Sequence, residues 1–129
     1  MKKNELRIGS WLSDGKEFFQ VDESFFTLLE LNMQFCKPIA LTEEILLKCG
    51  FEKVDFDYFI LKYGNNECYF SYKKSNLELC RNMQSTANAE IKHLHQLQNL
   101  YFAITNEELI FKSVYNWTLF IYNEYKLIK

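Results

Sequence analysis

Proline and glycine are scarce in this chain, which has one proline and four glycines among its 129 residues. Its turns therefore have to depend on Asn, Asp and Ser, whose side chains bond to nearby backbone groups. No window holds two glycines at the spacing of a glycine-rich phosphate-binding loop. Nucleotide binding by a loop of that kind is therefore excluded.

Long apolar runs and clustered positive charge are missing as well. No run approaches the roughly 18 apolar residues of a membrane span, so we expect no membrane insertion. The 15 basic and 17 acidic residues are spread along the chain, and the densest basic cluster is Lys73-Lys74. General nucleic-acid binding needs clustered Lys and Arg, so it is not expected here.

The four cysteines, at positions 36, 49, 68 and 80, lack the spacings of metal and redox motifs. No two of them are separated by only two residues, which excludes zinc-ribbon and thioredoxin-type sites. The first residues are not followed by an apolar stretch of signal-peptide length. We therefore expect a cytoplasmic protein, with reduced thiols and with neither a metal nor a cofactor.

Aromatic residues are in surplus, at 17% of a chain that is otherwise ordinary, with 48% hydrophobic and 25% charged residues. This length and composition predict a single domain over residues 1–129. We expect one small core to leave some aromatic rings exposed, so we predict a homo-oligomer that covers them. The candidates for exposed rings are Trp11, Phe18, Phe19, Tyr69, Tyr72, Trp117 and Tyr122.

The first third of the chain contains a predicted hairpin. Asp14 and Gly15 separate strand-like runs at 7–13 and 16–22, and a two-residue turn of this type needs positive φ at both positions. Residues 25–35 are apolar and strand-like, but their mixed period leaves a helix open.

Two helices are predicted further along. The first begins after Thr42, whose hydroxyl can cap the first turn, and ends at Gly50. The second covers residues 95–104, where apolar residues fall at i, i+3, i+4 and i+7. That apolar stripe consists of Leu97, Leu100, Tyr101 and Ile104.

The remaining segments are predicted as strands separated by Asn- and Ser-containing turns. For the tail at 114–128 a strand is favoured, with a helix as the alternative, and residues 112–129 form a C-terminal extension. We therefore expect an α+β fold, with a mostly antiparallel sheet of about six strands and two short helices packed on it. The strands expected after the first helix lie at 54–62, 68–73, 77–81, 89–94 and 109–111.

Three stretches together resemble one protein family. They read ELRIG at 5–9, PIALTEEILLKCGF at 38–51 and HQLQNLYFAIT at 95–105, the last followed by EEL at 107–109. The pattern resembles that of small uncharacterised proteins common in phages and prophages of Bacteroidota genomes. It departs from the family at Asn106, where glycine is usual, and in the aromatic tail. The resemblance implies a phage context without implying a mechanism.

Several residues could carry chemistry, although each also has a structural interpretation. His93 and His95 could share a metal if a distant ligand joined them, but His95 could equally cap the helix. Any cysteine could be a nucleophile beside a histidine, but no local motif marks one. The acidic pairs at 43–44 and 107–108 are better explained as favourable charges at element starts than as acid–base catalysts.

The polar face of the second predicted helix is the better candidate for a ligand site. Its amides could read hydrogen-bonding edges while an aromatic ring stacks beside them. The structural alternative is a solvated helix face, or side chains that tie the helix to a neighbouring strand. The candidate ligand-binding residues are Arg7, Trp11, His95, Gln98, Asn99 and Tyr101, with Lys73 as a further basic group.

These observations predict a non-enzymatic phage accessory protein that binds a partner. The favoured hypothesis is an inhibitor of host antiviral defence, which either sequesters a small nucleotide messenger or blocks a defence protein. One alternative is a structural or replication-associated protein-interaction module. Another is a small enzyme that uses His95 or a cysteine in a cleft.

Overall fold

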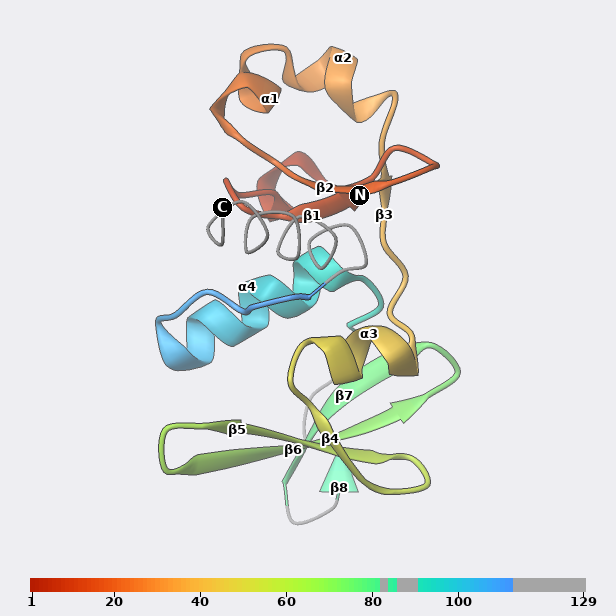
Figure 1. The fold of residues 1–129 in the computed structure, drawn as a ribbon, viewed down its shortest axis with the longest axis vertical. Coiled ribbons are helices and arrows are strands. Elements are labelled where there is room, and N and C mark those ends of the chain that lie inside the picture. The colour runs from red at the N-terminus through yellow and green to blue at the C-terminus, as the bar shows by residue number, and fades with distance from the viewer. Residues whose placement is uncertain (82–83, 86–90, 113–129) are drawn as a thin grey trace, which may run out of the picture.

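The computed structural model describes residues 1–81, 84–85 and 91–112. These residues form two antiparallel sheets, four α-helices and one 3₁₀ helix, stacked along the long axis of the molecule (Figure 1). The predicted α+β, mostly antiparallel fold is confirmed. The prediction of one six-stranded sheet is wrong in detail, because the described strands divide into sheets of three and five.

The first sheet belongs to residues 1–38, which we call the N-terminal lobe. Its strand order is β2-β1-β3, and both pairings are antiparallel. Two short helices lie on its outer side at one end of the molecule (Figure 1). The elements of this lobe are η1 (Lys3–Glu5), β1 (Trp11–Ser13), β2 (Phe18–Gln20), α1 (Glu23–Thr27), α2 (Leu29–Met33) and β3 (Lys37–Pro38).

The hairpin at Asp14 is confirmed, but the expected turn type is wrong. Only Gly15 has positive φ, and the last paired residues are Ser13 and Phe18, so the loop has four residues. The carboxylate of Asp14 explains the longer loop, because its Oδ1 accepts from the backbone N–H groups of Lys16 and Glu17, both at 2.8 Å. This side chain satisfies donors that a tighter turn would have paired across the strands.

The ambiguous stretch at 25–35 is helical, as α1 and α2. Asp22 caps α1 by accepting from the N–H of Phe25 at 3.1 Å. The amide of Asn32 in α2 then donates to the carbonyl of Phe25 at 2.8 Å and joins the two helices. The apolar residues serve a small core with a helical period, so their strand propensity does not decide the structure.

The helix predicted after Thr42 is confirmed as α3 (Glu43–Lys48). The Thr42 hydroxyl accepts from the N–H of Ile45 at 3.1 Å, as a cap should. Gly50 has φ of +92°, and the N–H of Phe51 then returns to the carbonyl of Leu46 at 3.1 Å. This closure of the C-terminus is a Schellman-type ending, for which glycine is strongly favoured.

The second sheet has strands in sequence order, each antiparallel to the next. The prediction of a single strand over 54–62 is wrong, because a turn at Phe56 and Asp57 divides the segment into two strands. Asp55 favours this turn, since its carboxylate accepts from the N–H of Phe56 at 2.7 Å. The strands are β4 (Glu52–Asp55), β5 (Tyr58–Tyr63), β6 (Asn66–Lys73), β7 (Asn76–Arg81) and β8 (Gln84–Ser85).

The second predicted helix is confirmed as α4 (Leu94–Thr105). The strand expected at 89–94 is wrong, since its described residues form only isolated bridges, Leu77 with Ile91 and Ala40 with His93. Helix α4 ends at Asn106, whose φ of +59° is the left-handed conformation that favours glycine or asparagine.

The segment after α4 alternates in burial but does not form the predicted strand. Leu109 and Phe111 are buried while Ile110 is 72% exposed. No sheet ladder includes 109–111 among the described strands, so the strand prediction is wrong. The contacts that hold the segment include a backbone bond from the N–H of Lys112 to the carbonyl of Lys48 at 3.2 Å. The predicted extension beyond residue 112 lies outside the described residues.

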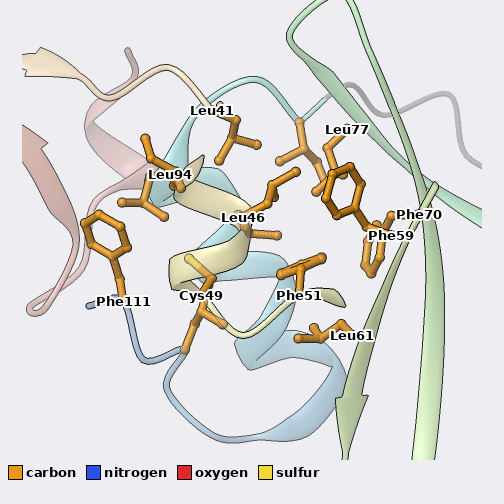
Figure 2. Packing of buried hydrophobic residues seen from close by; sticks show 14 of the residues in the cluster. Leu41, Leu46, Cys49, Phe51, Phe59, Leu61, Phe70, Leu77, Leu94 and Phe111 are labelled. Atoms are coloured by element: carbon orange, nitrogen blue, oxygen red, sulfur yellow. The ribbon is translucent and has the colours of Figure 1, made fainter. Parts of the chain in front are cut away.

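The main hydrophobic core lies between the second sheet and α4. Figure 2 shows Leu46 and Cys49 of α3 between the rings of Phe59 and Phe70 on one side and Phe111 on the other. A second, smaller core lies inside the N-terminal lobe, under α1 and α2. Its buried residues are Leu6, Leu12, Val21, Phe25 and Cys36. The two cores meet where β1 and residues 5–10 contact α4.

Candidate functional site

Five of the six predicted ligand-binding residues lie together. Arg7 and Trp11 come from the N-terminal lobe, and His95, Gln98 and Asn99 come from the facing side of α4. We call this contact between residues 5–11 and α4 the helix seam. The sixth residue, Tyr101, is half-buried on α4 and packs against the main core.

Gln98 occupies the centre of the helix seam and is only 2% exposed. Its Oε1 accepts from the N–H of Trp11 at 2.8 Å, and its Nε2 donates to the carbonyl of Gly9 at 2.9 Å. The carboxamide therefore pairs with the backbone as a neighbouring strand would. It continues the hydrogen bonding of β1, the central strand of the first sheet, onto α4.

Asn99 and Arg7 continue the helix seam toward the surface. Asn99 donates to the carbonyl of Glu5 at 2.7 Å and accepts from Nε of Arg7 at 2.7 Å. The guanidinium of Arg7 also forms an ion pair with Glu108 at 2.7 Å and lies 4.9 Å from the ring centre of Phe102. The donors of Arg7 are thus distributed over α4 and the segment that follows it.

His95 is fully buried at the other end of the helix seam. Its Nε2 donates to Oε2 of Glu5 at 2.9 Å, and this bond is the main reason that the pKa of Glu5 lies below its ordinary value. Its Nδ1 has no hydrogen-bond partner among the described residues. His93 stacks on His95 with ring centres 5.8 Å apart, and burial lowers the pKa of His93.

The contacts of these residues match the structural alternative stated for them, in which polar side chains tie the helix to a strand. Trp11 is likewise internal, 2% exposed and edge-on to Phe111 at 5.2 Å. Lys73 is exposed at the end of β6, in the second sheet, and the helix seam does not include it. The hydrogen-bonding groups expected to meet a ligand are largely used inside the chain.

Catalytic and metal chemistry find little support at the predicted positions. The ring of His95 is sealed from solvent, and burial raises the pKa of Cys49 to about 12, which keeps that thiol protonated and weakly nucleophilic. All four cysteines are free thiols. Within the described ranges no three His, Cys, Asp or Glu residues gather as metal ligands would, and no helix has the length and apolar character to cross a membrane.

The exposed aromatic rings are mostly not the predicted ones. Tyr69 is 36% exposed, whereas Phe18, Phe19 and Tyr72 are half-buried. Trp117 and Tyr122 lie outside the described residues. The most exposed rings are those of Phe56, at 82%, and Phe35, at 70%.

Phe35 borders a hollow in the N-terminal lobe that the sequence analysis did not predict. The hollow has a volume of about 320 Å³ and opens between β2 and the two short helices. We call it the lobe hollow. Its lining includes Phe19, Phe25, Phe35, Asn32, Asp14 and Asp22.

The lobe hollow depends on the same side chains that shape the local backbone. Asp14 holds the hairpin loop, Asp22 caps α1, and Asn32 joins α1 to α2. The mixed period of residues 25–35 leaves both a strand and a helix open, and neither alternative predicts the break at Leu28 that puts Phe25 and Asn32 on two separate helices.

The first prediction concerns Gln98. Replacement by methionine, Gln98→Met, keeps the volume but leaves the buried N–H of Trp11 without its acceptor. We expect the free energy of unfolding to fall by about 2 kcal/mol, the cost of one unsatisfied buried donor. Urea denaturation followed by Trp fluorescence measures the change.

Gln20→Met is the matched control. Gln20 is exposed and donates to the same Gly9 carbonyl at 3.2 Å. Its replacement should change the free energy of unfolding by less than about 0.5 kcal/mol. Equal effects of the two substitutions would show that the helix seam does not depend on Gln98.

The second prediction concerns acid stability. The pKa of His93 is lowered, mainly by burial, so the imidazole is protonated more readily in the unfolded chain than in the folded one. The free energy of unfolding therefore falls as the pH drops below 6.5. The pKa of Glu5 is lowered, mainly by its bond to His95, so its contribution is complete above 4.5 and is lost as pH falls through the lowered value.

Urea midpoints at about pH 7.5, 5.5 and 3.5 should therefore decrease in that order. His93→Asn should flatten the first decrease, because asparagine can cap α4 without titrating in this range. A wild-type midpoint that rises between the first two pH values would refute this assignment of the proton-linked groups.

Comparison with known proteins does not add a functional assignment. No family model, curated protein or solved structure matches the chain. The function therefore has to be argued from the helix seam and the lobe hollow themselves.

Proposed function

We propose that this chain is a non-enzymatic binding protein that uses the lobe hollow to engage a protein partner. The observation that carries the proposal is an aromatic-lined hollow of about 320 Å³ beside a phenyl ring that is 70% exposed. Exposed aromatic rings at concave sites are typical anchors for a partner.

Further apolar side chains on the same two helices support this surface. Leu28 is 58% exposed and Leu31 is 49% exposed. Apolar exposure of this kind is costly in water unless a partner covers it. Five-residue helices held by a few caps also leave room for small adjustments during binding.

The charge of the lobe hollow favours a protein over a nucleotide messenger. Asp14 and Asp22 both lie in its lining, and hydrogen bonds keep the pKa of each below its ordinary value. Two ionised carboxylates would repel the phosphates of a nucleotide. Together with the resemblance to phage proteins, this supports a role in blocking a host defence protein, in the host cytoplasm.

A second copy of the chain is the competing occupant. Self-association would also cover exposed aromatic rings. Light scattering on the purified protein separates the two cases. A dimer that Phe35→Ser dissociates would place a second copy, and not a host protein, on the hollow.

The test uses two matched variants, Phe35→Ser at the lobe hollow and Phe56→Ser at the turn between β4 and β5. Both remove an exposed phenyl ring, so both should fold. The assay uses host cells whose defence restricts a given phage. We expect that phage to form plaques on these cells when they make the wild-type protein or the Phe56→Ser variant. Phe35→Ser should reduce plating efficiency by about tenfold or more, as expected when a central anchor is lost.

Affinity capture from the same cells identifies the partner. One host protein should co-purify with the wild type and with Phe56→Ser and should be lost with Phe35→Ser. Equal plating and equal capture by both variants would refute the role of the lobe hollow.

A further inference from the structure

We propose that the lobe hollow receives a basic side chain, a lysine or arginine of the partner, with Asp14 and Asp22 binding its charge and the phenyl rings packing on its stem. This inference rests on the proposed function, since it names the group that the hollow would bind.

The lining combines two kinds of surface. Phe19, Phe25 and Phe35 contribute aromatic rings, and Phe19 and Phe25 lie against each other with ring centres 6.1 Å apart. No lysine or arginine lines the hollow among the described residues. An aromatic wall beside carboxylates suits a cation that carries an apolar stem, which gains both cation–π attraction and apolar contact.

The two carboxylates are oriented by the backbone and are not paired with a cation. Asp14 Oδ1 accepts from Lys16 and Glu17, and Asp22 Oδ1 accepts from the Ser24 hydroxyl and the N–H of Phe25. Five glutamates form ion pairs with a lysine or arginine in the described structure, whereas neither aspartate does.

The surrounding segment has the same sign of charge. Residues 14–35 contain five acidic side chains and one basic side chain, Lys16. Lys16 contributes only a minor part of the lowering of the Asp14 pKa. A negative rim around a partly apolar hollow attracts and orients a basic partner.

Other ligand classes fit less well. A divalent metal prefers several oxygen ligands, and no group of three candidate ligands occurs in the described ranges. An anion would be repelled by both aspartates. A basic side chain is the one common protein group whose shape and charge match both parts of the lining.

The test is an NMR titration of the full-length protein with three short peptides and one free amine. The peptides are acetyl-Gly-Leu-X-Leu-Gly-amide with Arg, Lys or Gln at X, and the amine is spermidine. The Arg and Lys peptides should shift backbone amides within residues 14–36. The Gln peptide should bind about tenfold more weakly, since it lacks the charge-assisted contacts.

The variants separate local contacts from net charge. Asp14→Asn with Asp22→Asn keeps oxygens that can accept the turn and cap hydrogen bonds but removes both charges from the hollow. Glu17→Gln with Glu23→Gln removes the same total charge outside its lining. We expect about a tenfold weaker affinity for the Arg peptide in the first pair and less than about a twofold change in the second.

Each outcome decides between the claims. Equal losses in the two pairs, or equal binding of the Gln peptide, would overturn the basic-side-chain inference. If Phe35→Ser still abolished partner capture, the proposed function would stand without the basic-side-chain inference. Binding of spermidine but of neither basic peptide would overturn a protein side chain as the source of the amine.

Discussion

The structure depends most on the carboxamide of Gln98, which joins α4 to β1, the central strand of the first sheet. It bonds to the N–H of Trp11 and the carbonyl of Gly9, two backbone groups far from it in sequence. Both of its polar ends are satisfied, so burial at 2% exposure does not leave an unpaired group. The contact fixes β1 against α4 and thereby fixes the N-terminal lobe on the main core.

The remaining features follow from that attachment. Trp11 can contact Phe111 only because its backbone is held beside α4. Arg7, Asn99 and Glu5 add polar contacts along the same line, so the helix seam is specified by hydrogen-bond geometry in addition to apolar area. Helices α1 and α2 lie on the opposite side of the first sheet from α4 (Figure 1), and their segment contributes Ser24, Phe25 and Asn32 to the lining of the lobe hollow. The proposed division is therefore between an anchored face and a binding face.

Sequence reasoning succeeded where the signals were local. Thr42 and Gly50 bound α3 by caps that act within a few residues, and the apolar stripe with Leu97 predicted α4. It failed where distant partners decide the outcome. The sequence left Gln98 open between a ligand-binding amide, a solvated residue and a tie to a strand, because its partners lie 87 and 89 positions away. Residues 25–35 could not be assigned from their period, because the bond from Asn32 to Phe25 depends on the helices being formed.

The central claim is that the helix seam makes the N-terminal lobe and the main core one cooperative unit. Native-state hydrogen exchange tests it at the amide of Trp11, compared with the amide of Leu97, which bonds to the carbonyl of His93 inside the helical region. The account predicts that both amides exchange only through global unfolding and report the same free energy. Exchange of the Trp11 amide at a much lower free energy, while Leu97 stays protected, would contradict it.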